Sequence, residues 1–86
     1  MVESMRILLA EDERTISRLI NQVLTNAGHD VVGVPSVVEA LEQIKAGRFD
    51  LVLLDLHLAD GDGMRLVSWI EELGGGAPPI VLMTGE

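Results

Sequence analysis

Short apolar runs alternate along the chain with longer stretches in which apolar and polar residues are mixed. Four of the runs are rich in Val, Ile and Leu, a pattern typical of strands buried on both faces of a parallel sheet. The four predicted strands are Arg6–Ala10, Asp30–Val34, the stretch Asp50–Leu56 and Ile80–Met83. The third run is the most informative, because the apolar residues of its middle lead directly into an acid, Asp55.

The stretch between the first two predicted strands has the spacing of an amphipathic helix. Its apolar residues recur every three or four positions and form one stripe. The stripe consists of Ile16, Leu19, Ile20, Val23, Leu24 and Ala27. Either Asp12 or Glu13 can cap the start of this helix, and Gly28 is placed as the residue just after its end.

Two more helices are predicted by the same reasoning. Ser36 and Glu39 form a capping box at the start of the second helix, and Gly47 ends it. A turn-rich loop over 57–63 precedes the third helix, which runs roughly from Met64 to Leu73. The residues expected to face the core are Val37, Ala40, Leu41, Ile44, Leu66, Val67, Ile70 and Leu73.

The resulting order is β-α-β-α-β-α-β. Strands that alternate with helices through short links indicate an α/β fold, a parallel sheet with helices on both faces and right-handed crossovers. The length of 86 residues suffices for one small domain, and no linker or second domain is apparent.

Composition narrows the possible functions. The formal charge is −8, from fourteen acidic and six basic residues, which argues against binding nucleic acid or an anionic membrane through this segment. There is no cysteine and therefore no disulfide or cysteine zinc site. The apolar runs are too short to span a bilayer, and the first residues lack the pattern of a signal peptide. A cytoplasmic protein is expected.

Polar side chains follow three of the predicted strands. They are Glu11 and Asp12 after the first, Asp55 at the end of the third and Thr84 after the fourth. Because the carboxyl ends of parallel strands meet at one edge of a sheet, these groups are expected to lie close together. Carboxylates in one pocket repel one another, and oxygen ligands favour a hard cation such as Mg²⁺. A carboxylate beside Mg²⁺ can act as a nucleophile toward phosphorus.

Each of these features also has a structural interpretation when it is taken alone. An acidic pair after a strand is often a helix cap and a solvated turn, and one acid at a strand end is often the start of a loop. The loop Asp60–Gly63 is a turn sequence that fails as a calcium loop, because Met64 occupies an oxygen position. Only the combination of these features at one edge of the sheet favours a Mg²⁺-binding phosphoryl-transfer site over a purely structural interpretation.

Four motifs in order resemble the receiver domain of two-component response regulators. They are Ile7–Asp12, Asp50–Leu56, the loop reaching Asp62 and Gly63, and Ile80–Gly85. The resemblance extends from Met5 to Glu86. It implies the doubly wound, flavodoxin-like and CheY-like fold and a signalling function, in which a sensor histidine kinase or a phosphotransfer protein supplies a phosphoryl group and the receiver is not itself an enzyme.

The resemblance also implies roles for individual residues. Asp55 is the implied phosphoacceptor, Asp12 a direct ligand of Mg²⁺ and Glu11 a ligand through water. His57 is expected to contribute its backbone carbonyl to the metal. Two interpretations of its side chain remain: it faces solvent in the loop, which is the favoured one, or it acts as a metal ligand or general base. Thr84 is the implied switch hydroxyl that contacts the phosphoryl group.

The sequence departs from the family pattern in one large way and, at Ala59 in place of a proline common in the loop, in one minor way. The family sheet has five strands in the order 2-1-3-4-5, whereas residues 1–86 provide only four, and so correspond to a partial receiver domain that lacks the last strand and two helices. The family lysine of the fifth strand is also missing, since Lys45 is the only lysine and lies in the second predicted helix.

Two expectations follow from this departure. The edge of the strand Ile80–Met83 and the apolar face of the first helix are predicted to be exposed, so the chain is expected to self-associate, for example as a dimer. An alternative function is then a phosphorylation-deficient interaction module that acts by oligomerising. A Mg²⁺-dependent phosphatase is poorly supported, because the position two residues after Asp55 holds His57 and not a second acid. A nucleotide-binding enzyme is poorly supported because no glycine-rich phosphate-binding motif occurs.

Overall fold

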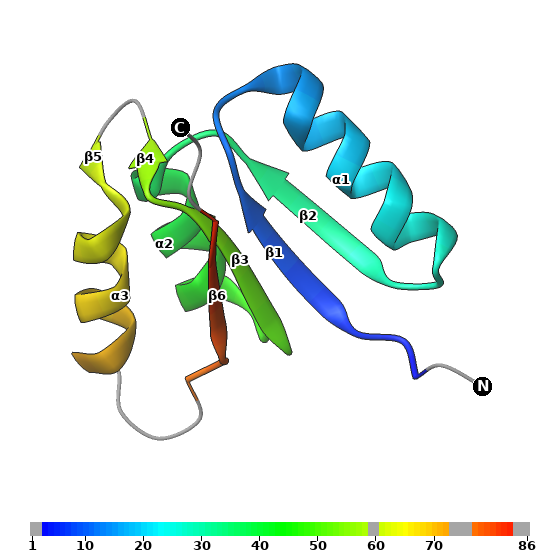
Figure 1. The fold of residues 1–86 in the computed structure, drawn as a ribbon. Coiled ribbons are helices and arrows are strands. Elements are labelled where there is room, and N and C mark those ends of the chain that lie inside the picture. The colour runs from blue at the N-terminus through cyan, green and yellow to red at the C-terminus, as the bar shows by residue number, and fades with distance from the viewer. Residues whose placement is uncertain (1–2, 59–60, 73–76, 84–86) are drawn as a thin grey trace.

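The computed structural model describes residues 3–58, 61–72 and 77–83. Its central sheet contains four strands, β1 (Arg6–Ala10), β2 (Asp30–Val34), β3 (Leu51–Asp55) and β6 (Ile80–Met83). Their order in space is β2-β1-β3-β6, and every neighbouring pair is parallel (Figure 1). This confirms the predicted parallel sheet. Because β6 is the fourth strand of this sheet along the chain, the observed order corresponds to the first four positions of the family order 2-1-3-4-5.

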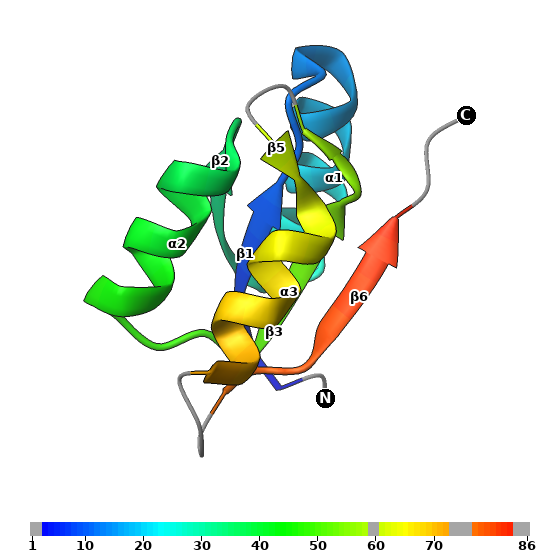
Figure 2. The same ribbon diagram turned by 90° about the vertical axis from the view of Figure 1, so that its left-hand side faces the viewer.

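Three helices cover the sheet: α1 (Arg14–Asn26), α2 (Val37–Ala46) and α3 (Gly63–Glu72). Helix α1 lies on one face of the sheet, and α2 and α3 lie on the other (Figures 1 and 2). The predicted alternation of strands and helices is therefore confirmed, with helices on both faces. Among the described residues, no helix combines the length and the apolar character needed to cross a bilayer.

Local capping signals explain where the helices begin and end. The Ser36 hydroxyl accepts a hydrogen bond from the Glu39 amide at 3.1 Å, as the capping box predicts. The Glu13 carboxylate accepts bonds from the amides of Thr15 and Ile16, so that Glu13, rather than Asp12, caps α1. Gly28 follows this helix with φ of +98°, the left-handed conformation that favours glycine.

The loop after β3 differs from its prediction as a region of turns only. It contains two short strands, β4 (His57–Leu58) and β5 (Gly61–Asp62), which pair antiparallel. Leu58 is buried against the core and anchors this hairpin. Strands of two residues are too short for a period-2 pattern to be recognised in the sequence, because an alternation needs several residues to be visible.

The main core lies between the sheet and the pair α2 and α3. Its buried residues come from alternate positions of the strands and from the inner faces of both helices. They are Leu8, Ala10, Val34, Val37, Ala40, Ile44, Phe49, Val52, Leu54, Leu58, Leu66 and Ile70. The predicted inward residues Leu41 and Val67 are half-buried against this cluster, and Leu73 lies outside the described residues.

The opposite face of the sheet is less completely covered. Helix α1 packs mainly on β2 and β1, over the fully buried Ile7 and Leu9, but no residue of α1 itself is buried. Of its predicted stripe, Ile16, Leu19 and Val23 are 45%, 64% and 58% exposed. The periodicity correctly predicted a helix, whereas only part of the stripe contacts the sheet.

Candidate metal centre

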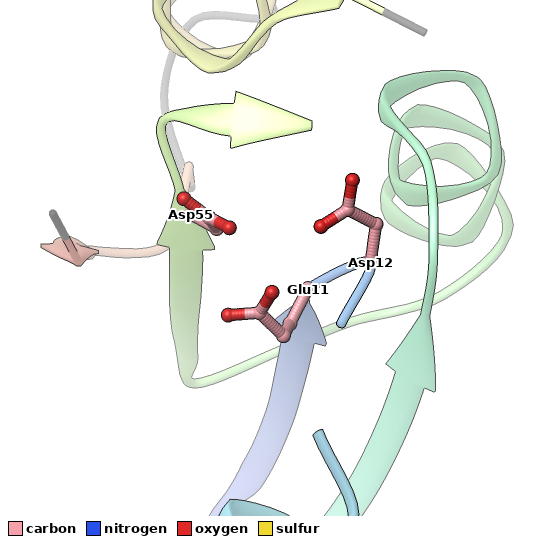
Figure 3. Close-up of side chains that lie close together, drawn as sticks. All are labelled: Glu11, Asp12 and Asp55. Atoms are coloured by element: carbon pink, nitrogen blue, oxygen red, sulfur yellow. The ribbon is translucent and has the colours of Figure 1, made fainter. Parts of the chain in front are cut away.

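Three carboxylates meet at the carboxyl ends of the two central strands. Glu11 and Asp12 follow β1 directly, and Asp55 is the last residue of β3, which pairs with β1 in parallel. One carboxylate oxygen from each of the three residues lies within 4.8 Å of the other two. Figure 3 shows the side chains pointing into the same space from the ends of the two strands.

Backbone hydrogen bonds of the sheet hold two of these residues in place. The Glu11 amide donates to the Val34 carbonyl at 3.0 Å, which extends the pairing of β1 with β2 by one residue. On the other side, the Leu56 amide donates to the Met83 carbonyl at 3.3 Å, and Asp55 is in register with Met83. The acidic cluster is therefore supported by strands rather than by loops alone.

The capping of α1 leaves the Asp12 carboxylate directed toward Asp55. Glu13 satisfies the first amides of the helix, while its own amide donates to the Glu11 carboxylate at 3.0 Å. In Figure 3 the Asp12 side chain faces the other two acids. Of the three consecutive acids, Glu13 caps the helix, whereas Glu11 and Asp12 line the cluster.

Burial makes the cluster electrostatically unfavourable without a cation. Glu11 and Asp55 are only 7% and 8% exposed, whereas Asp12 is exposed. Desolvation raises the pKa of Glu11. Asp55 raises this pKa further through a hydrogen bond and charge repulsion, and Asp12 does so through charge repulsion, whereas the hydrogen bond from the Glu13 amide lowers it. A divalent cation between the three groups would offset both the desolvation and the charge repulsion. An all-oxygen ligand set fits a hard ion such as Mg²⁺.

A groove of about 790 Å³ opens beside the cluster. It runs between α1 and the end of β2, and its lining includes Asp12, Arg14, Arg18, Gly33 and Pro35. Positive side chains along the groove therefore adjoin the negative cluster. The lining also includes Glu11, so the groove borders two of the three acids.

The other predicted site residues are only partly accessible to description. His57 begins β4, two residues after Asp55 in the chain, while its side chain lies outside the described part. Thr84 lies outside the described residues, directly after β6. The sequence reasoning missed that a side chain at Gly63 would collide with the Asp55 carbonyl oxygen, because the residue pair Asp-Gly before a helix indicates only a turn.

Comparison with known proteins agrees with this fold. The family model of the response regulator receiver domain matches residues 7–86. The chain belongs to the response regulator receiver domain family.

Two of the relatives are named as regulatory proteins of bacteria. The chain is 37% identical over 81 residues to the swarming motility regulation protein RssB of Serratia marcescens, and 34% identical over 76 residues to the transcriptional regulatory protein GlrR of Escherichia coli. These matches include 93% and 88% of this chain but only 36% and 17% of the relatives. The chain therefore spans about a third or less of the curated relatives it matches.

Solved structures show the same architecture. A sensor protein from Polaromonas sp. JS666 is 33% identical with a TM-score of 0.86, and the match covers 94% of this chain and 66% of that one. The CheY-like receiver domain from Methylobacillus flagellatus is 25% identical with a TM-score of 0.89, covering 98% and 72%. The described residues thus form a CheY-like α/β fold, with four strands in the main sheet and without the final βα unit.

Proposed function

We propose that residues 1–86 form a receiver domain, partial in its last βα portion, that accepts a phosphoryl group on Asp55 from a sensor histidine kinase or a phosphotransfer protein in the cytoplasm. The observation that carries the proposal is the convergence of Glu11, Asp12 and Asp55 within 4.8 Å at the carboxyl end of the sheet. Phosphorylation would then switch the conformation or the association of the protein. The protein would modify itself rather than turn over a substrate, so it is not proposed as an enzyme.

The transfer follows from the chemistry of Asp55. One oxygen of its carboxylate attacks phosphorus, the P–N bond of the phosphorylated imidazole breaks, and the imidazole leaves with the electron pair. Asp55 is nearly buried at a strand end, so its position is set by the sheet and the attacking oxygen is pre-oriented. Mg²⁺ at the cluster, when bound, would neutralise the charge that the carboxylates and the phosphoryl oxygens bring together.

The resemblance to the family assigns the remaining roles in this proposal. Asp12 and Asp55 would hold Mg²⁺ directly, Glu11 through a water molecule, and His57 through its backbone carbonyl. The Thr84 hydroxyl would donate a hydrogen bond to a phosphoryl oxygen. Lys45, the sole lysine of the chain, lies exposed in the last turn of α2 and takes no part.

The groove beside the cluster supports the proposed phosphodonor. Its lining joins Asp12 to Arg14 and Arg18 of α1, so a partner that docks there reaches the acids directly. We expect Arg18→Glu to slow phosphoryl transfer from a kinase while leaving transfer from the small donor acetyl phosphate unchanged. Arg65→Glu on α3 is the matched control, because Arg65 is exposed on the opposite face of the sheet.

The central experiment is phosphorylation by acetyl phosphate with Mg²⁺, followed by intact mass spectrometry. The expected result is a mass increase of one phosphoryl group that depends on Mg²⁺ and is abolished by Asp55→Asn. Asp50→Asn is the control, directly before the first residue of β3, where the carboxylate accepts a bond from the Arg6 amide at 2.8 Å. If the mass does not change in the unmodified protein, the proposal is wrong.

A second candidate function is a receiver-like module that acts by self-association without phosphorylation. It is favoured by the exposed stripe of α1 and by Val81 and Leu82 of β6, which are 48% and 44% exposed on the edge strand. Sedimentation velocity at micromolar concentration distinguishes the two functions when it is combined with the acetyl phosphate experiment. A dimer that forms equally with Asp55→Asn supports the second function.

A further inference from the structure

The first residue of α3, Gly63, lies directly against the backbone that leaves Asp55. Its amide donates a hydrogen bond to the Leu56 carbonyl at 3.1 Å, and the residue is buried. A Cβ atom at this position would lie 2.8 Å from the Asp55 carbonyl oxygen and 2.9 Å from the Leu56 Cα atom. Both are backbone atoms and cannot rotate away, so any other residue at this position would displace the end of β3 or the start of α3.

The same contact closes the base of the hairpin. Strand β4 pairs with β5 through His57 opposite Asp62 and Leu58 opposite Gly61, and the bond from Gly63 to Leu56 continues this pairing by one position. Asp55 ends β3 immediately before this base. The start of α3, the hairpin and the last residue of β3 are therefore joined through the backbone at Gly63.

We propose that Gly63 is a positioning residue for the metal centre. Its missing side chain allows α3 to approach β3, and this approach sets where Asp55 and the His57 carbonyl lie relative to Glu11 and Asp12. The inference rests on the proposed function, because it assumes that the cluster holds Mg²⁺. The ion requires near-ideal octahedral geometry at about 2.0–2.1 Å, so a small shift of Asp55 would lower its affinity.

The test compares two alanine substitutions at glycines of different environment. At Gly63 alanine meets the backbone of the site, whereas at Gly28 it has open space within 4 Å but an unfavourable φ of +98°. Both variants are expected to lower the thermal stability, and only Gly63→Ala is expected to change the site. The readout is the dissociation constant of Mg²⁺ by isothermal titration calorimetry, with thermal unfolding measured in parallel.

We expect Gly63→Ala to raise the dissociation constant of Mg²⁺ about tenfold or more, the usual effect of disturbing a residue that supports metal ligands. Gly28→Ala is expected to leave it at the value of the unmodified protein. If Gly63→Ala is unfolded in plain buffer, all proteins are titrated in trimethylamine N-oxide, which favours the compact state.

The outcomes separate this inference from the proposed function. Unchanged Mg²⁺ affinity in folded Gly63→Ala overturns the role of Gly63, and so does an equal loss of affinity in both variants, which would reflect general destabilisation. If the unmodified protein binds no Mg²⁺, the proposed function itself is wrong.

Discussion

The two faces of the sheet carry similar amphipathic helices but differ in how completely they are covered. On one face, α2 and α3 pack side by side and bury Leu66 and Ile70 almost completely. On the other, α1 packs mainly over β2 and β1, and Leu19 remains largely exposed. In the described part of the chain, no second helix shares that face (Figures 1 and 2). An apolar stripe is thus buried only where a neighbouring element completes the layer.

The largest effect is expected from truncating the same residue type on the two faces. Leu66→Ala should lower the free energy of unfolding by about 2–5 kcal/mol, because it leaves a cavity in a close-packed core. Leu19→Ala should change it by less than about 0.5 kcal/mol, because the side chain is mostly in water already. Urea denaturation followed by the fluorescence of Trp69, which is half-buried against the core, measures both.

Comparable losses for the two variants would contradict this difference between the faces. They would show that Leu19 is buried in solution, as it would be in a dimer that forms through α1. Repeating the denaturation over a range of protein concentrations identifies that case, since the stability of a dimer depends on concentration.

A smaller effect is expected on self-association. Leu19→Lys places a charge in the exposed stripe of α1 and should weaken any dimer formed through this face by at least about tenfold, or about 1.4 kcal/mol. Val38→Lys is the matched control, because Val38 is exposed to a similar degree on α2 at the opposite face. Sedimentation equilibrium compares the two. If both variants associate as the unmodified protein does, association does not involve α1.

The acidic cluster predicts a pH dependence of the metal-free protein. The folded-state pKa of Glu11 is raised mainly by burial, so between its unfolded-state pKa and this raised value the native state binds more protons than the unfolded state. Stability in EDTA should therefore fall as the pH rises through this window. Glu11→Gln should abolish this decline and stabilise the metal-free protein at neutral pH, on the order of 1 kcal/mol.

The control for this prediction is Glu42→Gln, on the exposed surface of α2. Denaturation at several pH values in EDTA measures the slope for each protein. A decline in stability that is identical in Glu11→Gln and in the unmodified protein would show that other groups cause it.

Most of the elements could be predicted because their signals are local. The capping box of Ser36, the glycine after α1 and the apolar periodicity all act within a few residues. The strand Ile80–Met83 and the helix capped by Ser36 were predicted with their observed limits. The convergence of Glu11, Asp12 and Asp55 was also predictable, because parallel strands present their carboxyl ends at one edge.

Other features required the tertiary structure. The choice of Glu13 over Asp12 as the cap of α1 depends on how β1 leads into the helix. The pairing of β4 with β5 depends on the burial of Leu58, which no short-range pattern reveals. The cost of a side chain at Gly63 depends on two backbone segments that meet only after folding.

For this protein, the sequence alone determined the order of strands and helices and the edge of the sheet at which the acids gather. Both follow from periodicity and chain direction, which are properties of neighbouring residues. Only the tertiary structure decided which apolar stripe is buried and how closely α3 approaches Asp55. Those outcomes depend on packing between segments distant in the chain. The residues adjacent to Leu19 and Gly63 in the sequence therefore do not indicate that Leu19 is exposed or that Gly63 lies against β3.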